Sequence, residues 1–371
     1  MFKIVILGLG RIGASIARLL YDSGFYQLCL VDKFQLSIDN LDADLQPFAK
    51  LLDVNNKKPL LSLLKKNQLV LSACTFKENP LIAETALLAE CSYFDLTEDI
   101  QCTKIIQKLA QQAKPGQVFM PQCGLAPGFI DILGYDLSQY FSKLFTLKMR
   151  VGALPEFPTN QMLYNLTWST EGLINEYCNP CDAIKNGQYT QLLALEGLEI
   201  FSLDGVEYEA FNTSGGLGTL CETLAGKVQD LSYKTVRYPG HRLLMTFLFN
   251  ELRLGEKGKR RETLKQIFES SIAVTDQDLV IIMASATGLL NGRLTEVTEV
   301  YKIYYQSLHG KIWSAIQLTT ASAACVAIDL FCNKKLPQQG FIKQEDITLK
   351  DFLNNSFARF YQQAKANRRA I

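Results

Sequence analysis

The stretch Lys3–Gly13, KIVILGLGRIG, decides the fold of the first part of this chain. Its first five residues form an apolar run typical of a buried strand, and Ile12–Tyr21 has the apolar spacing of a helix. The turn between the two has the pattern G-x-G-x-x-G. A strand, a glycine-rich turn and a helix in this order predict a site for the pyrophosphate of a dinucleotide.

The residues of this turn have different expected roles. Gly8 permits the tight turn, Gly10 lets the backbone approach the pyrophosphate, and Gly13 allows the helix to pack closely on the strand. Arg11 and Ile12 open the helix and are expected beside the phosphates. The alternative is a glycine turn that binds nothing.

Asp32 follows the next predicted strand, Gln27–Val31, and lies 22 residues after Gly10. A carboxylate at this place accepts hydrogen bonds from the adenosine ribose and repels a 2′-phosphate, so the sequence favours NAD over NADP. Lys33 works against that preference, because a cation there accommodates the extra phosphate.

Strand and helix patterns alternate up to about residue 120. They predict βαβ units and a parallel sheet covered on both faces, which is an α/β fold with a doubly wound Rossmann sheet. Ligands bind outside the carboxyl ends of such strands, so residues at three further strand ends are expected near the cofactor, with ordinary turns as the alternative. They are Asp53, Val54, Ala73, Cys74, Thr75, Leu96 and Thr97.

The composition is that of an ordinary folded protein. Of 371 residues, 48% are hydrophobic and 20% are charged, which excludes intrinsic disorder. Lys and Arg total 38 against 37 Asp and Glu, so no bulk charge attracts nucleic acid or anionic lipid. The apolar run Ala321–Ile328 is too short to span a membrane, and residues 1–10 lack a signal-peptide pattern. We expect a soluble, cytoplasmic protein with neither nucleic acid nor membrane as a partner.

Ten cysteines without a signal peptide indicate reduced thiols. Cys178 and Cys181 have a suggestive spacing, but the chain holds only two histidines, so we expect no metal. The basic stretch Lys257–Arg261 lacks interleaved aromatic residues and is expected to be a solvated turn.

After about residue 130 the pattern changes to longer, alternating strands, which predict an α+β domain with a mixed sheet. The strands are expected at Leu147–Val151, Leu198–Leu203, Val206–Phe211, Leu279–Ala286 and Leu294–Tyr305. Helical patterns fall at Leu220–Lys227, Arg242–Leu252 and Trp313–Phe331.

Six segments carry a resemblance that goes beyond the nucleotide fold. They are Cys123–Gly128 (CGLAPG), Val151–Pro155 (VGALP), Leu166–Tyr177 (LTWSTEGLINEY), Ile184–Gly187 (IKNG), Tyr208–Phe211 (YEAF) and Thr235–His241 (TVRYPGH). On these segments the chain resembles the saccharopine dehydrogenase family, and within it the lysine 6-dehydrogenase branch. One position departs: saccharopine reductases carry an acidic residue just before the Pro-Gly, where this chain has Ala126, and this argues against saccharopine as the substrate.

The resemblance implies a domain division and a substrate-binding arginine. Residues 1–127, completed by C-terminal helices in 312–371, are expected to bind the dinucleotide. Residues 128–311 are expected to bind the substrate and to mediate homodimers. The arginine that the resemblance implies in Thr235–His241 is Arg237.

Oxidation of an amine requires a neutral nitrogen and an anchored substrate. Asp95, Glu98 and Asp99 follow a strand end where the nicotinamide is expected, and we expect them to recognise the ammonium, with Asp95 as a catalytic residue. His241 is the candidate for proton handling. The alternatives are an acidic helix N-terminus for Glu98 and Asp99 and a structural role for the histidine.

Arg237 is expected to bind the α-carboxylate of an amino acid, because guanidinium and carboxylate form two parallel hydrogen bonds. Arg150 and Arg293 are the next candidates for this anchor. Trp168 and Tyr208 are candidate walls for the aliphatic part of the substrate, with core packing as the alternative.

Together these features predict an NAD-dependent amino-acid dehydrogenase that oxidises the side-chain amine of L-lysine by hydride transfer to nicotinamide. One alternative is a saccharopine or carboxynorspermidine-type dehydrogenase using NAD(P), which needs a second cation at the site. The alternative from another class is a non-catalytic NAD-binding sensor or scaffold.

Overall fold

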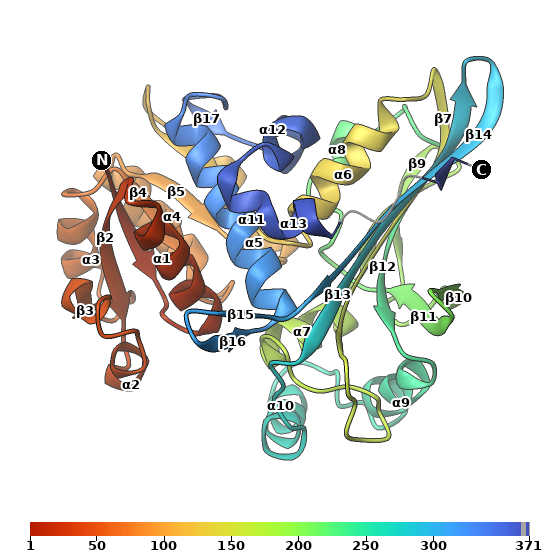
Figure 1. Ribbon diagram of the computed structural model, residues 1–371, viewed down its shortest axis with the longest axis horizontal. Coiled ribbons are helices and arrows are strands. Elements are labelled where there is room, and N and C mark those ends of the chain that lie inside the picture. The colour runs from red at the N-terminus through yellow and green to blue at the C-terminus, as the bar shows by residue number, and fades with distance from the viewer. Residues whose placement is uncertain (365–368, 371) are drawn as a thin grey trace. The chain divides into compact units, whose positions relative to one another are not determined.

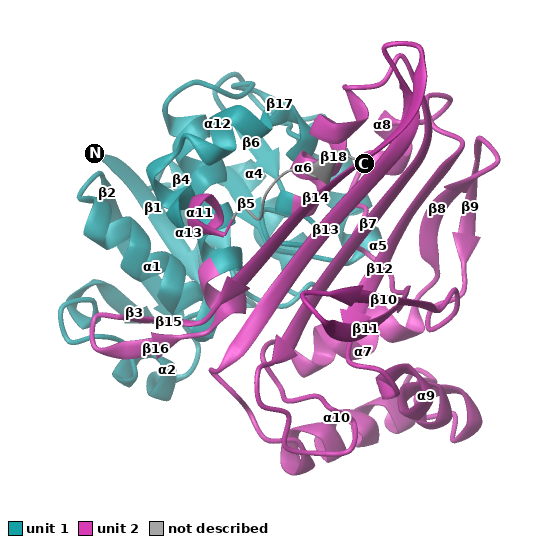
Figure 2. Ribbon diagram, turned by 45° about the vertical axis from the view of Figure 1, so that its right-hand side comes forward, with its two compact units in different colours: residues 1–129, 319–360 teal, residues 130–318, 361–371 magenta. Residues whose placement is uncertain are grey.

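The computed structural model describes residues 1–364 and 369–370. The chain divides into two compact units, of which the first comprises residues 1–129 and 319–360 and the second comprises residues 130–318 and the described residues from 361 onward (Figure 2). The expected division placed all of 312–371 with the nucleotide-binding half. Residues 312–318 and the described residues from 361 onward belong instead to the second unit, where β18 (Arg369–Ala370) pairs with β14 (Arg293–Tyr304).

The first unit is built on a parallel sheet of seven strands in the order β3-β2-β1-β4-β5-β6-β17. Strands β2, β3, β4, β5 and β17 of this sheet are labelled in Figure 1. The strands are β1 (Phe2–Leu7), β2 (Tyr26–Asp32), β3 (Ala49–Leu51), β4 (Leu69–Ser72), β5 (Ser92–Asp95), β6 (Val118–Met120) and β17 (Gly340–Phe341). Six of them follow the 3-2-1-4-5-6 order of a Rossmann sheet. The predicted α/β class and doubly wound sheet are confirmed.

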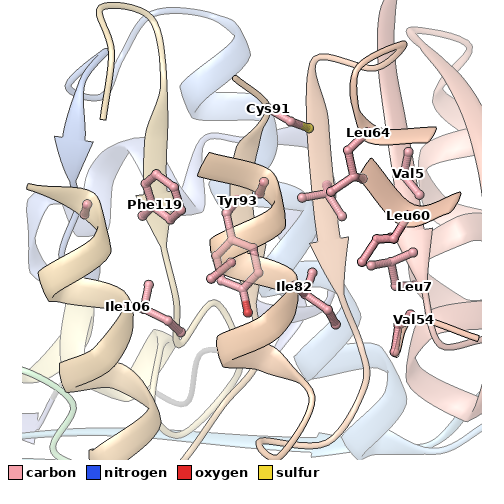
Figure 3. Close-up of a cluster of buried hydrophobic side chains, with 14 of the residues drawn as sticks. Val5, Leu7, Val54, Leu60, Leu64, Ile82, Cys91, Tyr93, Ile106 and Phe119 are labelled. Carbon is pink, nitrogen blue, oxygen red and sulfur yellow. The ribbon is translucent and has the colours of Figure 1, made fainter. Parts of the chain in front are cut away.

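Both faces of this sheet are buried, as the continuous apolar runs of its strands predict. Val5 and Leu7 of β1 belong to a cluster with α3, α4 and α5, in which Tyr93 stacks on Phe119 at 6.0 Å (Figure 3). Ile6 points to the other face and is also fully buried. The helices of the unit are α1 (Arg11–Ser23), α2 (Gln35–Asp39), α3 (Lys57–Leu64), α4 (Asn79–Ala89), α5 (Ile100–Ala110) and α12 (Leu349–Leu353).

Helix α11 (Ala315–Cys332) leads the chain back to the first unit. Within the described part of the chain, it alone is long and apolar enough to pass a length-and-composition test for a membrane span. Because 72% of it is buried, it also has the character of a core helix.

The second unit contains a mixed sheet of nine strands, with the path β10-β11-β12-β7-β13-β14-β18 and with β8 and β9 attached to β12. Its strands include β7 (Lys143–Pro155), β8 (Cys181–Lys185), β9 (Gln188–Leu192), β10 (Glu199–Leu203), β11 (Val206–Asn212), β12 (Asp230–Arg237) and β13 (Asp278–Leu290). A separate small hairpin joins β15 (Gln306–Leu308) and β16 (Lys311–Trp313). Since β7 pairs in parallel with β12 and antiparallel with β13, the predicted mixed sheet is confirmed.

The helices of the second unit were harder to predict. They include α6 (Phe129–Ser138), α7 (Thr170–Cys178), α8 (Leu220–Thr223), α9 (His241–Thr246), a π-helical turn (Phe247–Glu251), α10 (Lys259–Ser271) and α13 (Arg359–Gln363). The expectation of a solvated turn at Lys257–Arg261 is wrong from Lys259 onward. Leu264 and Phe268, one turn apart on α10, are buried in a hydrophobic cluster that stabilises this helix.

Candidate functional site

The glycine turn has the geometry that a pyrophosphate site requires. Gly8 has a φ of 87°, and a Cβ on it would lie 2.9 Å from the carbonyl oxygen of Ala73. A Cβ on Gly13 would overlap the carbonyl oxygen of Gly8. By contrast, the Cβ position of Gly10 meets no other described group within 4 Å, and Gly10 is the N-cap of α1. The turn is closed on its protein side and open at the helix N-terminus, so it fits a dinucleotide phosphate.

Asp32 stands beside this turn at the carboxyl end of β2. Its carboxylate accepts hydrogen bonds from the backbone N–H of Leu9 at 2.7 Å and of Phe34 at 2.8 Å. Each oxygen keeps a further lone pair for a ribose hydroxyl. Lys33 is exposed, with its Nζ 5.2 Å from the centre of the Phe34 ring. The two side chains with opposite expected effects on NADP therefore both lie at this edge.

The other predicted cofactor residues lie at the ends of neighbouring parallel strands. Asp53 and Val54 follow β3, with Val54 buried and Asp53 bonded to the N–H of Asn55 at 2.9 Å, which lowers the Asp53 pKa. Ala73, Cys74 and Thr75 follow β4, where burial raises the pKa of the Cys74 thiol to about 12 and keeps it protonated.

Asp95 does not fit the predicted ammonium site. Its side chain is fully buried at the end of β5, and it accepts hydrogen bonds from Tyr93 Oη (2.7 Å), Thr97 N (2.9 Å), Gln122 N (3.0 Å) and Asn79 Nδ2 (3.3 Å). Burial raises its pKa to about 6. These contacts hold the loops after β5 and β6 together, so the structure gives Asp95 a positioning role and leaves its oxygens no access to a substrate.

The four residues that follow Asp95 differ in their burial and in their hydrogen bonds. Leu96 is half-buried and Thr97 is buried at the end of β5. Asp99 is the N-cap of α5 and accepts a hydrogen bond from the N–H of Cys102 at 2.8 Å. This contact supports the alternative to ammonium recognition, in which Asp99 stabilises a helix N-terminus. Glu98 is half-buried and keeps its candidacy at this strand end.

Arg237 ends β12 in the second unit and is only 3% exposed. Its Nε donates to Tyr177 Oη at 3.1 Å, its Nη1 donates to the Val236 carbonyl at 2.8 Å, and its guanidinium lies 5.1 Å from the centre of the Tyr164 ring. Within the described chain no carboxylate lies at ion-pair distance from it. Desolvation lowers the pKa of Arg237, but the hydroxyls of the two tyrosines and the carboxylate of Glu176 raise it by more, so the buried group stays charged. A buried cation of this kind favours an anionic ligand.

Glu209 is a carboxylate near Arg237 that does not form an ion pair with it. The two residues lie directly opposite each other in the β11–β12 pair. The Glu209 carboxylate, however, accepts hydrogen bonds from the backbone N–H groups of Gly240 (3.0 Å) and Arg242 at the start of α9. The nearest cross-strand carboxylate is thus committed to the helix and leaves the guanidinium available.

His241 is fully buried beside Arg237, but it does not fit the predicted role in proton handling. Its Nε2 lies 3.2 Å from Tyr177 Oη and its Nδ1 lies 3.0 Å from the Met162 carbonyl, so both ring nitrogens are engaged. Burial, and then the charge of Arg237, lower its pKa to about 3. The imidazole stays neutral at physiological pH and is a weak base.

The two aromatic residues expected to contact the substrate, Trp168 and Tyr208, lie on opposite faces of the mixed sheet. Trp168 packs on the cluster that holds Tyr164 and Tyr177. Tyr208 belongs to another cluster with Val236, and because neighbouring strand residues point to opposite faces, Tyr208 and Arg237 lie on opposite faces. Tyr208 is therefore excluded from an Arg237 site and packs on the ring of Tyr238 at 5.7 Å.

The alternative anchors are also placed away from Arg237. Arg150 lies opposite Lys234 in the β7–β12 pair, on the Val236 face, and pairs with Glu199 at 2.7 Å. Arg293 is exposed at the start of β14. Of the three arginines that the sequence offered, the structure leaves Arg237 as the buried one with no carboxylate partner in the described chain.

Sequence reasoning missed Tyr164, Thr167 and Tyr177. Thr167 and Tyr177 lie in the segment Leu166–Tyr177, and only their position in it pointed to a role. The hydroxyls of Tyr164 and Thr167 are buried; the polar groups close to the Tyr164 hydroxyl are those of Thr167 and Trp168, and within the described residues neither hydroxyl makes a hydrogen bond of full geometry. Buried hydroxyls of this kind beside a buried cation favour a polar ligand here.

No group of three or more His, Cys, Asp or Glu able to hold a metal occurs in the described part of the chain.

Two family models match the chain. Residues 4–120 match the saccharopine dehydrogenase NADP binding domain, and residues 124–363 match the saccharopine dehydrogenase C-terminal domain.

One solved structure agrees with the chain at the level of the fold, and two others are less similar. An apo saccharopine dehydrogenase (L-Glu forming) from Saccharomyces cerevisiae is 14% identical, with a TM-score of 0.80 and coverage of 100% of both chains. A myo-inositol 2-dehydrogenase from Lactobacillus plantarum is 11% identical, with a TM-score of 0.45 over 95% of this chain and 93% of that chain. A biliverdin reductase from Synechocystis, in complex with biliverdin and NADP+, is 12% identical, with a TM-score of 0.40 over 98% and 99%.

Three observations agree on the fold of a dinucleotide-binding dehydrogenase: the strand order of the parallel sheet, the tight glycine turn at Gly8 and Gly13, and the two matched domains. The chain belongs to the saccharopine dehydrogenase family and is an oxidoreductase with an NAD(P)-binding domain.

Proposed function

We propose that this protein is an NAD-dependent dehydrogenase that oxidises the side-chain amine of L-lysine. When bound, the nicotinamide would take up a hydride from the carbon that carries the amine, and the nitrogen lone pair would form a C=N bond to that carbon. The glycine turn would hold the pyrophosphate, and Asp32 would orient the ribose. Arg237 would anchor the α-carboxylate.

The observation that carries the proposal is the burial of Arg237 without a carboxylate partner among the residues that the structure describes. A desolvated guanidinium is expensive unless a ligand supplies the missing charge. The buried hydroxyls of Tyr164 and Thr167, which make no hydrogen bond of full geometry within the described residues, support a small polar ligand. An amino acid supplies the carboxylate for Arg237 and an amine at its other end for oxidation.

A single anchoring arginine favours lysine over saccharopine. Saccharopine carries additional carboxylates, which would require further cations at the site. Arg150, the strongest candidate for a second anchor, is engaged with Glu199 on the opposite face of the sheet. Ala126, where saccharopine reductases carry an acidic residue, supports the same choice.

The cofactor preference rests on Asp32. Its carboxylate is held beside the glycine turn by two backbone N–H groups, where it would repel a 2′-phosphate. We also propose a homodimer, on the family resemblance alone, and a cytoplasmic location, on the ten cysteines that we expect to be reduced thiols; size-exclusion chromatography with light scattering tests the dimer.

A screen of substrates and cofactors tests the function. We would follow reduced nicotinamide by absorbance with L-lysine, saccharopine and a carboxylated polyamine, each with NAD and with NADP. Turnover with lysine and NAD at a higher kcat/KM than every other pair supports the proposal. Preference for saccharopine or the polyamine would overturn it, and cofactor binding with no turnover would favour a sensor.

A further inference from the structure

A directional chain of hydrogen bonds runs through the Arg237 cluster. The Met162 carbonyl can only accept, so the Nδ1 of His241 carries the proton that is shared across 3.0 Å. The neutral ring then has a bare Nε2, which accepts from the Tyr177 hydroxyl at 3.2 Å. The Tyr177 oxygen in turn accepts from Arg237 Nε at 3.1 Å. Each donor direction follows from the one before it.

This chain determines which part of the guanidinium a ligand can reach. The Nε–H is engaged by Tyr177, and one Nη1–H is engaged by the Val236 carbonyl. The remaining N–H groups are all on Nη1 and Nη2. A carboxylate therefore cannot bind side-on through Nε and Nη2, and it must approach the Nη end.

We propose that Tyr177 and His241 are positioning residues that set the orientation of Arg237 and thereby the selection for substrates with a carboxylate. The proposal rests on the proposed function of Arg237 as the carboxylate anchor. In this arrangement His241 holds the Tyr177 hydroxyl in place, and Tyr177 holds Nε of Arg237 in place.

Tyr177→Phe is the direct test, because it removes the hydroxyl that joins Arg237 to His241 and keeps the ring beside the guanidinium. We expect the KM for lysine to rise about tenfold to a hundredfold, as for loss of a hydrogen bond to a charged group, with kcat changed less than about twofold. Activity toward 1,5-diaminopentane, which lacks the carboxylate, should not change. Tyr208→Phe is the matched control, since it deletes a buried tyrosine hydroxyl on the opposite face.

His241→Gln provides a conservative second variant. Its side-chain oxygen can still accept from Tyr177, so the KM for lysine should lie between those of the wild type and Tyr177→Phe. A fall in kcat with both substrates and an unchanged KM for lysine, in either variant, would overturn the positioning role.

A readout without turnover separates this proposal from the proposed function. The chain has only two histidines, so ¹⁵N-histidine labelling gives two rings, and His309→Gln assigns them. We expect His241 to keep its proton on Nδ1 from pH 5 to pH 8, and its Nε2 signal to shift in Tyr177→Phe but not in Tyr208→Phe. A proton on Nε2, or no shift in Tyr177→Phe, would show that the chain of hydrogen bonds is wrong. The expected spectra with no lysine turnover would instead remove the proposed function.

Discussion

Replacing Arg237 by alanine tests the anchoring of the substrate most directly. Arg237 is 3% exposed and has no carboxylate partner in the described chain, so the pair it would form with a substrate carboxylate is desolvated. Loss of such a pair costs about 2–5 kcal/mol. At 1.36 kcal/mol per factor of ten, kcat/KM for lysine should fall about 30-fold to 5,000-fold.

The assay compares kcat/KM for L-lysine and for 1,5-diaminopentane by absorbance of reduced nicotinamide. Arg237→Lys should recover only part of the loss, since an ammonium cannot form two parallel hydrogen bonds. The diamine should be a poor substrate for wild type and should lose little further activity in the variants. Affinity for NAD should be unchanged, because the glycine turn is expected to bind the phosphates.

A structural role for Arg237 would give a different pattern. Arg237→Met removes a buried charge that the protein leaves without a carboxylate, so the free energy of unfolding of the ligand-free protein should stay the same or rise. An Arg237→Ala protein that folds, binds NAD and oxidises lysine at the wild-type rate would remove Arg237 from the site and refute the argument.

Four further predictions concern the cofactor, the pH and the fold. Asp32→Ala should narrow the preference for NAD over NADP, measured as the ratio of the two Kd values; a wild-type preference for NADP would make Lys33 the controlling residue. Neither His241 nor Asp95 is a suitable base, so kcat/KM for lysine should rise with pH above neutrality toward the free-amine pKa of about 10.4, and a flat profile between pH 7 and 9 would contradict this. The pKa of His241 is about 3 in the folded protein against 6.5 for the ordinary side chain. Its contribution to the free energy of unfolding is therefore fully present above pH 6.5 and is lost as pH falls toward 3, by up to roughly 5 kcal/mol. Urea unfolding of wild type and His241→Gln should show that acid loss only in wild type, and equal slopes against pH would disprove it. Gly13→Ala should abolish NAD binding or destabilise the first unit because its Cβ would overlap the Gly8 carbonyl, and a stable, NAD-binding variant would contradict the packing argument.

The first unit was predictable because its signals are local. The spacing of Gly8, Gly10 and Gly13 between a strand and a helix requires few contacts distant in sequence, and the position of Asp32 follows from the next strand. Arg237 could be found because it lies within the segment Thr235–His241. In each case the residue type and a short stretch of chain determine the geometry.

The errors have a common physical origin in contacts between distant segments. The Asp95 carboxylate accepts hydrogen bonds from Asn79 at the start of α4 and from Gln122 in the loop after β6. Both ring nitrogens of His241 are engaged, by Met162 and by Tyr177. A titratable residue in a sequence shows its chemistry but not its burial.

The error at Tyr208 arose from strand register. Its separation from Arg237 depends on the β11–β12 pairing, and a shift of one residue would have put both side chains on the same face. Short-range patterns do not determine that register.

The commitment of Glu209 to α9 has a consequence for the abundance of this protein in a cell. With its cross-strand carboxylate engaged elsewhere, Arg237 of the empty protein is a buried positive charge with no carboxylate at ion-pair distance in the described chain, and the folded state is less stable for that reason. A carboxylate ligand removes the deficit and adds RT ln(1 + [L]/Kd) to the free energy of unfolding. Proteases act on unfolded chains, so molecules that hold substrate survive longer than empty ones. The steady-state amount of this dehydrogenase should therefore rise with the supply of the metabolite it consumes, without any change in its synthesis.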